Sequence, residues 1–516
     1  MAPKISSRNP ATGEVLRELD CAGEAEILEA VQRARCAQPA WAEMGVRTRL
    51  NALRRFQKKL HEKKSEIAAA ITRETGKSCT EAMITEVLIV LDAARFLIDN
   101  AFALLRDEPL PHGNFATKLK SGRLVREPHG VIGVISPWNY PFSIPATEAL
   151  AALVAGNAVV LKPSELTPAI ALELADLLYA SGVPRDVFQV VVGEGAAGAA
   201  LVHSPIDKLV FTGSVATGKR IAAAAAERLL PVVLELGGKD PLIVLDDADI
   251  DVASSAAVWG AFVNAGQTCL SVERCYVHRS LYEKFVNACA EKAQKLRVGN
   301  GMDSTTDMGP MIHERQLRIV EAHVEDAKAR GARVLVGGKR RPDLGPNFYA
   351  PTVLADVTHD MRLMREETFG PVLPIMPFDN DDEAARLAND SEYGLAACVW
   401  TSDSARGERL ARCIHAGTVM VNDVISCFGI SEAPHGGVKA SGVGRTHGRF
   451  GLEEMVRLKY LDTDQMPNMK KIWWYGYGET FRRQMEGFLD LQFAGTLVTR
   501  LRGAFRATGS LWRKRL

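Results

Sequence analysis

The 516-residue sequence lacks a net charge of either sign, because 63 lysines and arginines against 62 aspartates and glutamates leave a formal +1. A balanced charge gives the whole chain no electrostatic attraction to nucleic acid, so any such attraction has to be local. Long apolar runs are also missing, since no stretch approaches the ~18 consecutive apolar residues of a membrane span. The first residues, "MAPKISSRNPATGEV", contain no apolar signal segment. We expect a cytoplasmic protein without a spanning helix.

Cysteine pairing patterns are absent as well. The nine cysteines are odd in number, widely scattered and without C-x-x-C spacing, which argues against a disulfide framework, a zinc site or a dithiol redox centre. A reducing compartment is therefore expected, and no metal site. Internal repeats and low-complexity linkers are not found. With 47% hydrophobic residues, the chain exceeds the size of a single hydrophobic core, so two or more domains are expected.

Hydrophobic spacing predicts helices from about residue 25 to 104. From about residue 123, short β-branched runs alternate with helical stretches, through "VIGVI", "NAVVLK", "VFQVVVG", "KLVFTG" and "PVVLEL". A second series follows Gly237 and Gly238, with "PLIVLDD", "RCYVHR", "ARVLVGG", "VLPIMPF", "AACVWTS" and "GTVMVND". Strands that alternate with helices predict parallel sheets covered on both faces. The expected fold class is α/β, with two α/β domains joined near this glycine pair.

The turns that follow the strands of the first series are the expected ligand sites, because parallel sheets bind ligands at the carboxyl ends of their strands. After "KLVF", Gly213 and Ser214 open a helix whose free N–H groups would favour a pyrophosphate, although glycine in such a turn is often only a backbone requirement. In "KPSE", Lys162 and Glu165 follow another strand. An acidic group there can bind ribose hydroxyls and repel a 2'-phosphate, or the two residues can form a solvated charge pair.

Three residues have side chains suited to catalysis. In "SPWNYPF", two prolines favour a stiff loop in which the amide of Asn139 could stabilise an oxyanion or cap its own backbone. In "LELGGKDP", Glu235 ends an apolar strand, where desolvation would raise its pKa toward that of a general base, unless the side chain is exposed. In "NAGQTCLSVER", Cys269 is either a small buried hydrophobe or a nucleophile, and its partners elsewhere in the chain decide between these.

Eight segments in order resemble the NAD(P)-dependent aldehyde dehydrogenase superfamily, over about residues 7–462: "SPWNYPF", "GNAVVLKPSE", "FTGSVATGKR", "LELGGKDP", "GQTC", "EETFGPVLP", "NDSEYGLAACVWT" and "PHGGVKASGVGR". The resemblance implies that Cys269 attacks the aldehyde, that Asn139 holds the oxyanion and that Glu235 activates the water that hydrolyses a thioester to the carboxylic acid. It implies NAD as the cofactor, with NADP possible. The cofactor-binding residues that it implies are Trp138, Lys162, Ser164, Glu165, Gly195, Gly213, Ser214, Glu367 and Phe369.

The resemblance also implies a domain organisation. It assigns residues 1–105 and 128–236 to a Rossmann-type NAD-binding domain and residues 237–440 to an α/β catalytic domain. Residues 106–127 and 441–463 would form a small β arm that joins subunits into a homodimer or homotetramer. Residues 464–516 lie beyond the usual end of the family and form a basic C-terminal extension.

Two indications of the substrate disagree. The stretch "VNDVISCFGISEAPHGG" is similar to that of fatty-aldehyde relatives, whereas "NPATGEV" and "GQTCLSVERCYV" are similar to relatives that act on succinate semialdehyde. His435 stands where many members of the family have an aromatic residue. A hydrophobic, medium- or long-chain aldehyde is expected, and succinate semialdehyde is the alternative. A substrate with a distal carboxylate would need a cation near the mouth of the tunnel.

The C-terminal extension is strongly basic. Residues 465–516 carry ten lysines and arginines and three acidic residues, a formal +7 that leaves −6 for the rest of the chain. Large apolar residues recur there every three or four positions and predict a basic amphipathic helix: Phe481, Met485, Phe488, Leu489, Phe493, Leu497, Leu501 and Phe505. Such a helix could lie in a membrane interface, pack on a partner subunit or cover the tunnel mouth. It fits lipid or protein better than nucleic acid. A non-catalytic membrane- or partner-binding protein on this fold is the remaining alternative.

Overall fold

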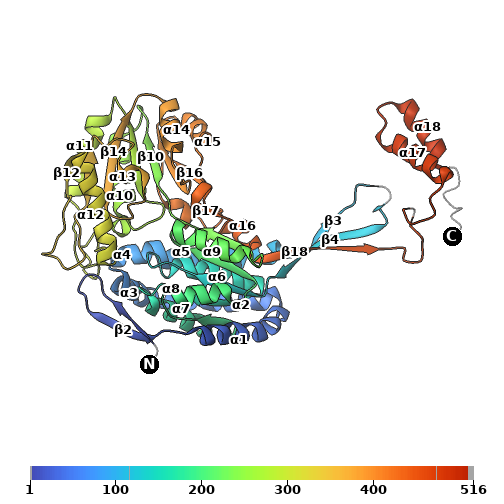
Figure 1. Ribbon diagram of the computed structural model, residues 1–516, viewed down its shortest axis with the longest axis horizontal. Coiled ribbons are helices and arrows are strands. Elements are labelled where there is room, and N and C mark those ends of the chain that lie inside the picture. The colour runs from blue at the N-terminus through green and yellow to red at the C-terminus, as the bar shows by residue number, and fades with distance from the viewer. Residues whose placement is uncertain (1–2, 115–116, 472, 509–516) are drawn as a thin grey trace. The chain divides into compact units, whose positions relative to one another are not determined.

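A computed structural model of the chain describes residues 3–114, 117–471 and 473–508 (Figure 1). Its contacts divide the chain into two units. The larger unit comprises Met1–Arg106 and Glu127–Arg457, and the smaller one comprises Asp107–Arg126 and Leu458–Leu516.

The larger unit begins with a hairpin followed by the helices that hydrophobic spacing predicted. The hairpin strands are β1 (Lys4–Arg8) and β2 (Val15–Asp20). The helices are α1 (Glu24–Glu43), α2 (Gly45–Glu62), α3 (Lys64–Thr75), α4 (Cys79–Ala82), the π-helical turn η1 (Met83–Val87) and α5 (Leu88–Leu104). Gly76 ends α3 with a φ of 80°, a conformation in which glycine has no steric cost.

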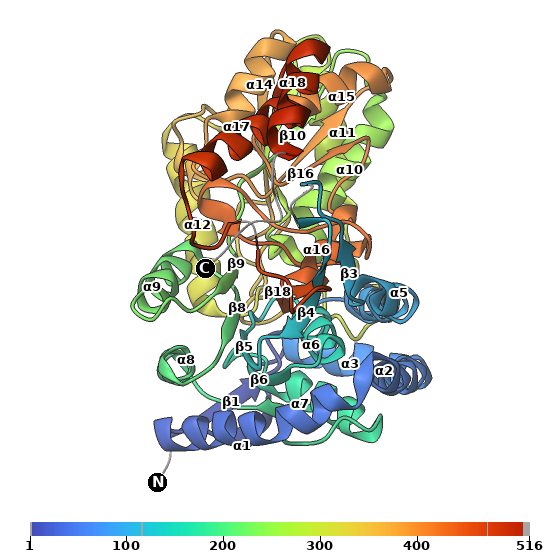
Figure 2. The ribbon, with the colours of Figure 1, turned by 90° about the vertical axis from the view of Figure 1, so that its right-hand side faces the viewer.

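A six-stranded sheet follows, in the order β17-β9-β8-β5-β6-β7. Its parallel strands are β5 (Val131–Ile135), β6 (Ala158–Lys162), β7 (Phe188–Val190), β8 (Lys208–Thr212) and β9 (Val232–Glu235). The connecting helices are α6 (Ser143–Ala155), α7 (Pro168–Ala180), α8 (Gly195–His203) and α9 (Val215–Ala226). Figure 2 shows α8 and α9 on one side of these strands and α6 on the other. The chain runs outward from β5 to β7 and then returns to the other side of β5, so the strand order reverses between β5 and β8.

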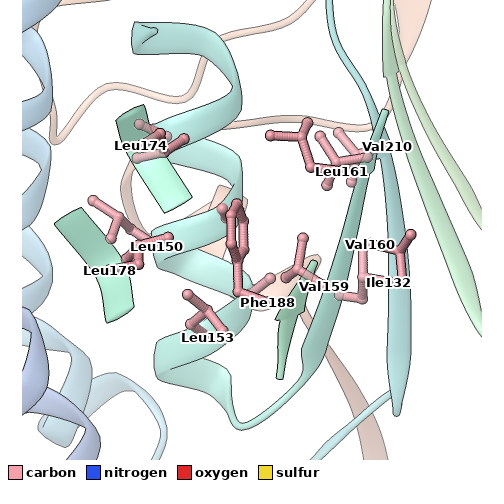
Figure 3. Packing of buried hydrophobic residues seen from close by; sticks show 14 of the residues in the cluster. Ile132, Leu150, Leu153, Val159, Val160, Leu161, Leu174, Leu178, Phe188 and Val210 are labelled. Carbon is pink, nitrogen blue, oxygen red and sulfur yellow. The ribbon is translucent and has the colours of Figure 1, made fainter. Parts of the chain in front are cut away.

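The core of this sheet is made by apolar residues of strands and helices together. Figure 3 shows Leu150 and Leu153 of α6 and Leu174 and Leu178 of α7 beside the strand residue Phe188. All five side chains are at most 3% exposed. Burial of such a side chain contributes roughly 1.5–3 kcal/mol, so this core holds the carboxyl ends of the strands in fixed positions.

A seven-stranded sheet forms the second half of the larger unit, in the order β12-β13-β14-β11-β10-β15-β16. Its strands are β10 (Asp240–Val244), β11 (Val272–His278), β12 (Arg333–Val336), β13 (Thr352–Ala355), β14 (Val372–Phe378), β15 (Ala396–Trp400) and β16 (Thr418–Val421). Strand β13 was not predicted, and β12 pairs with it antiparallel while the other pairs are parallel. The predicted α/β class is confirmed.

Helices and short turns connect the strands of this second sheet. They are α10 (Ile250–Phe262), η3 (Val263–Gly266), α11 (Tyr282–Gln294), α12 (Glu314–Ala329), α13 (Arg362–Arg365), α14 (Asp381–Asn389), α15 (Ser404–Arg412), η4 (Ser426–Gly429), η5 (Lys439–Ser441) and α16 (Gly448–Glu453).

The predicted β arm differs from the structure at its second segment. Strand β17 (Gly442–Val443) pairs antiparallel with β9, and α16 packs against α5 and α6, so residues 441–457 belong to the larger unit. The physical reason is the backbone pairing of Gly442 with Glu235, which joins this segment to the six-stranded sheet. The functions assigned to the domains stay predictions.

The smaller unit holds a three-stranded sheet and a pair of helices. The sheet has the order β18-β4-β3, with β3 (Glu108–Leu110), β4 (Lys120–Pro128) and β18 (Val456–Asp464). The single amphipathic helix predicted for the extension is wrong: α17 (Glu479–Phe493) and α18 (Leu497–Thr508) are separate. The helix ends because Ala494 is extended, and the hydroxyl of Thr496 then accepts the N–H of Thr499 at 3.3 Å.

The two C-terminal helices pack closely through glycine. A Cβ atom on Gly503 would lie 2.6 Å from the carbonyl oxygen of Gly487, so no larger residue fits at this crossing. No helix in the described part of the chain has the length and apolar character required to cross a bilayer.

Candidate active site

The carboxyl edge of the six-stranded sheet carries most of the predicted site residues, because its strands are parallel and end together. Glu235 ends β9 and Lys162 ends β6, while Gly195 is the first residue of α8, after β7. The remaining residues that follow strands directly are Trp138 and Asn139 after β5, Ser164 and Glu165 after β6, and Gly213 and Ser214 after β8. The reversal of strand order between β5 and β8 places a ligand crevice at this edge.

Two helices begin at this edge in a way that suits a pyrophosphate. Ser214 caps α9, since its hydroxyl accepts the N–H of Thr217 at 3.4 Å. A Cβ atom on Gly213 would lie 2.6 Å from the ring of Phe211, so only glycine fits there. At Gly195, by contrast, a Cβ atom would meet no atom within 4 Å, which leaves open space at the start of α8. Free N–H groups and the positive end of a helix dipole favour a bound phosphate.

Lys162 and Glu165 form an ion pair beside this edge. The Nζ of Lys162 is 3.4 Å from Oε2 of Glu165, and the two side chains are 6% and 45% exposed. Burial lowers the pKa of Lys162, and the carboxylate of Glu165 opposes that shift. Ser164 is buried, and its hydroxyl accepts the N–H of Leu166 at 3.3 Å. A half-exposed carboxylate at this place suits ribose hydroxyls and disfavours a 2'-phosphate.

Trp138, Glu367 and Phe369 come together near the glycine pair that follows β9. The rings of Trp138 and Phe369 pack edge to face at 5.4 Å. Oε1 of Glu367 accepts the N–H of Gly238 at 3.0 Å, and burial raises the pKa of Glu367 to about 8.

A buried ion pair that sequence reasoning missed holds the Glu367–Phe369 segment. Glu273 accepts a hydrogen bond from the ammonium of Lys239 and from the backbone N–H groups of Thr368, at 2.9 Å, and Phe369, at 2.8 Å. Phe369 has a φ of 51°, an uncommon conformation for a residue with a side chain. The carboxylate of Glu273 therefore fixes a backbone that would otherwise be strained.

The segment before Cys269 is strained in the same way. Asn264, Ala265 and Gly266 have φ values of 53°, 54° and 72°, and strain of this kind is concentrated at functional sites. A Cβ atom on Gly266 would lie 2.1 Å from the oxygen of Gly370, and one on Gly238 would lie 2.4 Å from the oxygen of Cys269. Both glycines are required because backbone approaches them closely.

The loop after β5 is bonded to the cysteine loop. Nδ2 of Asn139 donates to the oxygen of Gln267 at 3.0 Å, and the hydroxyls of Tyr140 and Thr268 are 2.7 Å apart. One amide hydrogen of Asn139 is thus used to align the two loops.

Lys77 and Glu86 hold the loop that carries Asn139 through hydrogen bonds, and neither residue was predicted from the sequence. The ammonium of Lys77 donates to Oε1 of Glu86 and to the carbonyl oxygen of Asn139, each at 2.7 Å. Oε2 of Glu86 accepts the N–H groups of Phe142 and Ser143 at 2.8 and 3.1 Å, which caps the start of α6. Glu86 lies in the π-helical turn η1, a conformation frequent at functional sites. The available signal was the three charged residues Lys77, Glu81 and Glu86 within the short segment "GKSCTEAMITEV".

Cys269 and Glu235 line one cavity. The other lining residues are Ile144, Thr147, Glu148, Thr212, Leu236, Leu395, Phe428, His435, Thr446 and His447, and Asn139 is not among them. Burial raises the pKa of Cys269 well above that of an ordinary thiol, and the charges of Asp240, Glu367 and Glu235 add to this shift. The thiol form of Cys269 is therefore favoured, so its reaction as a nucleophile needs a base.

Glu235 is a buried carboxyl without a hydrogen-bond partner for either oxygen. Burial raises its pKa well above the usual range, and the charge of Glu148 raises the pKa further, while Arg445 lowers it. His435, the residue at which the sequence departs from many relatives, has its Nε2 3.7 Å from Oε2 of Glu235. A carboxyl with a raised pKa is suited to accept and release protons near neutral pH.

The structure combines a parallel sheet of reversed strand order, helices that begin at glycine on its carboxyl edge, and a thiol beside a carboxyl. These features define the class of dinucleotide-binding α/β proteins with a reactive site. The chain belongs to the aldehyde dehydrogenase family, whose sequence profile matches residues 2–461. It is an NAD(P)-dependent aldehyde dehydrogenase.

Individual relatives show how far this similarity extends. The chain is 40% identical to the 4,4'-diapolycopene aldehyde oxidase of Methylomonas sp, over 94% of this chain and 91% of that protein. It is 41% identical to a putative succinate-semialdehyde dehydrogenase [NADP(+)] of Mycolicibacterium smegmatis, over 89% and 88%. The structure of the NAD+ complex of an aldehyde dehydrogenase from Bacillus cereus aligns with a TM-score of 0.86 and 37% identity, over 90% and 93%.

Proposed function

We propose that this enzyme oxidises a hydrophobic, medium- or long-chain aldehyde to the carboxylic acid, with NAD preferred to NADP. The observation that carries the proposal is that the lining of the cavity contains no lysine or arginine and has, beside its polar groups, the apolar residues Ile144, Leu236, Leu395 and Phe428. Succinate semialdehyde, the alternative, has a distal carboxylate that would need such a cation. The names of the relatives do not decide between these substrates, because one relative is named for a diapolycopene aldehyde and the other for succinate semialdehyde.

The proposed first half-reaction forms a bond between Cys269 and the substrate. Glu235 takes the thiol proton, and the sulfur bonds to the carbonyl carbon to give a thiohemiacetal. The side-chain amide of Asn139 and the backbone N–H of Cys269 stabilise the negative oxygen. Gly213, Ser214 and Glu165 would hold NAD at the sheet edge, where the cofactor would supply a hydride acceptor. Loss of the hydride from the thiohemiacetal leaves the acyl group on Cys269 as a thioester.

The proposed second half-reaction hydrolyses this thioester. Glu235, again ionised, takes a proton from water while the water oxygen bonds to the acyl carbon. The carbon–sulfur bond then breaks, the carboxylic acid leaves and the sulfur recovers the proton that Glu235 took from water. The proton that Glu235 takes from the thiol in the first half-reaction therefore has to leave the site by another route.

A chain-length series tests the substrate. Each buried methylene contributes about 0.8 kcal/mol, so two more methylenes should raise kcat/KM about tenfold until the tunnel is filled. NADH release would be compared for hexanal, octanal, decanal and succinate semialdehyde. A kcat/KM that is flat with chain length and highest for succinate semialdehyde would contradict the proposal.

We also propose that α17 and α18 lie on an anionic lipid surface, which would bring the enzyme to long-chain substrates. Leu489, Phe493, Leu497 and Leu501 are 53–73% exposed. The exposed Arg500 and others in the extension give residues 465–516 a formal +7. Apolar side chains between cationic ones are typical of helices that lie in a headgroup layer.

Vesicle flotation tests this contact. The full chain should float with phosphatidylserine vesicles, and the double change Leu497→Glu and Leu501→Glu should abolish flotation. Leu28→Glu, at an equally accessible leucine on α1 that is 50% exposed, is the matched control and should have no effect. Equal flotation of all three proteins would contradict the lipid contact.

We propose, finally, that the three-stranded sheet of the smaller unit joins subunits into a homodimer or homotetramer. Within this sheet, β18 presents Leu458 and Tyr460, which are 64% and 47% exposed. Exposed apolar residues on a small sheet favour association with another chain.

A further inference from the structure

Buried polar atoms without partners gather around the cavity of Cys269. Among the described residues, these atoms include both carboxylate oxygens of Glu235, Oε2 of Glu148, Nδ1 of His435 and Nε2 of His447. All four residues line the same cavity. Buried polar groups in proteins almost always bind a protein group or an ordered water. The concentration of such atoms here therefore indicates a cavity that binds water.

The two histidines are held in place beside Glu235. Nε2 of His435 is 3.7 Å from Oε2 of Glu235, and the ring centres of His435 and His447 are 5.9 Å apart. Phe428 packs edge-on against both rings, at 5.1 and 4.5 Å. The backbones of His435 and Thr446 exchange two hydrogen bonds of 2.8 Å, which fixes the segments that carry the rings. Each ring keeps one unpartnered nitrogen at the cavity.

Glu148 and His447 connect this cavity with a second one. The second cavity shares Thr147, Glu148, Thr446 and His447 with the first. The rest of its lining comes from α5, α6, α16 and the loops around α16. A proton that passes from Glu235 to Glu148 or His447 has therefore reached a residue that also lines the second cavity.

The protonation states suit a relay in which no histidine keeps the proton. Burial lowers the pKa of His435 to about 3 and that of His447 to about 4, so both rings are neutral and can accept at one nitrogen and donate at the other. Burial raises the pKa of Glu148 to about 8, and a hydrogen bond from Thr212, at 3.1 Å, opposes this shift.

The charged groups that act on Glu235 are few. Glu148 and Glu454 disfavour its ionised form and Arg445 favours it. Glu454 is already paired with the ammonium of Lys208, at 2.5 Å. Glu148 is thus the carboxyl left to share a proton with Glu235, because two close carboxyls in a buried site do not ionise together easily.

We propose that Glu148, His435 and His447 form a proton-transfer cluster that takes, through ordered water in the cavity, the proton that Glu235 accepts in the first half-reaction. Glu235 returns to its carboxylate as this proton passes to Glu148, or through a histidine that donates from one nitrogen as it accepts at the other, and then toward the second cavity. No group is oxidised or reduced in this step. The cluster acts through Glu235 and rests on the proposed role of that residue, so its members are positioning residues.

The test separates the two half-reactions by rapid mixing with aldehyde and NAD. Glu148→Gln and His435→Phe should keep the amplitude of the first NADH burst and lower the steady-state rate at least tenfold, with KM for NAD unchanged. Glu148→Asp keeps a carboxyl and should recover much of the rate. Glu173→Gln, an exposed carboxylate on α7, is the control and should match the unaltered enzyme.

Two results would overturn the cluster. One is a wild-type steady-state rate and pH profile in both Glu148→Gln and His435→Phe. The other, which needs no variant, is a strictly linear dependence of the steady-state rate on the deuterium fraction of the solvent, since transfer through the cluster moves several protons and gives a curved one. Absence of NADH formation from any of the aldehydes by the unaltered enzyme would instead contradict the proposed function itself.

Discussion

Cys269 is a thiol in surroundings that oppose its ionisation. Burial and three neighbouring carboxyls raise its pKa, so the nucleophile forms only as its proton is taken. The exchange Cys269→Ala should reduce NADH formation to background, because no other group in the cavity can carry the acyl chain. Binding of NAD, measured by fluorescence quenching, should be unchanged. The matched control is Cys275→Ala, within β11, where the fully buried thiol only packs and activity should persist.

The raised pKa of Glu235 determines how turnover depends on pH. The carboxylate is the active form, and it is populated above its pKa, which burial and Glu148 place well above the usual carboxyl range. The rate of thioester hydrolysis should therefore rise with pH through an apparent pKa higher than that of a free glutamate. Measuring kcat from pH 5 to 9 checks this.

Glu235→Gln should remove that pH dependence. It should release one equivalent of NADH per site, more slowly than the unaltered enzyme, and then stall at the thioester. Sustained turnover of Glu235→Gln at the original rate would show that another group is the base.

At the scale of single elements, the buried pair of Lys77 and Glu86 holds the loop between β5 and α6. The exchange Glu86→Gln would leave a buried ammonium without its counter-charge, which typically costs about 3–5 kcal/mol of the free energy of unfolding. The N–H groups at the start of α6 would lose an ionised acceptor as well. Denaturant unfolding should show this loss, and kcat should fall because Asn139 is displaced.

Glu29→Gln, which removes an exposed ion pair, is the control for the loss of stability expected in Glu86→Gln. Glu29 pairs with Arg33 on α1 at 2.5 Å, but the two side chains are 67% and 45% exposed. Exposed pairs of this kind contribute about 0–1 kcal/mol. If the two exchanges destabilised the protein equally, the support of the loop by Lys77 and Glu86 would be refuted.

Elements also show which parts of the fold and site could be predicted from sequence. The strands of the first sheet are β-branched runs between glycines, and Asn139 and Glu235 follow such runs directly, so their place at one edge could be predicted. Glu148 lies within α6, and only its burial distinguishes it from a solvated helix residue. His447 and Glu148 are distant in the chain, and only tertiary contacts bring them to one cavity. The C-terminal stripe predicted one helix because hydrophobic spacing does not register the extended residue at Ala494.

At the scale of the whole molecule, the exposed face of β18 is the feature that we expect to determine the oligomeric state. Leu458→Glu would place a charge among apolar residues at the proposed subunit contact, where an unpaired buried charge is costly. Light scattering after gel filtration should show a dimer or tetramer for the unaltered chain and a smaller species for the variant. Leu28→Glu, on α1, should leave the mass unchanged. A monomeric unaltered enzyme would contradict the assignment of this sheet to subunit association.

The two-residue strand β17 links distant parts of the chain. Gly442 pairs with Glu235, the N–H of Leu236 donates to the oxygen of Ser441 at 2.9 Å, and a Cβ atom on Gly442 would lie 2.1 Å from the oxygen of Leu234. The same few backbone hydrogen bonds thus hold both the proposed base, Glu235, and the segment that carries His435. Hydrogen–deuterium exchange of the two segments should therefore change together, so a ligand that slows exchange in one segment should slow it in the other. Any larger residue at position 442 should break the pairing and raise exchange in both segments.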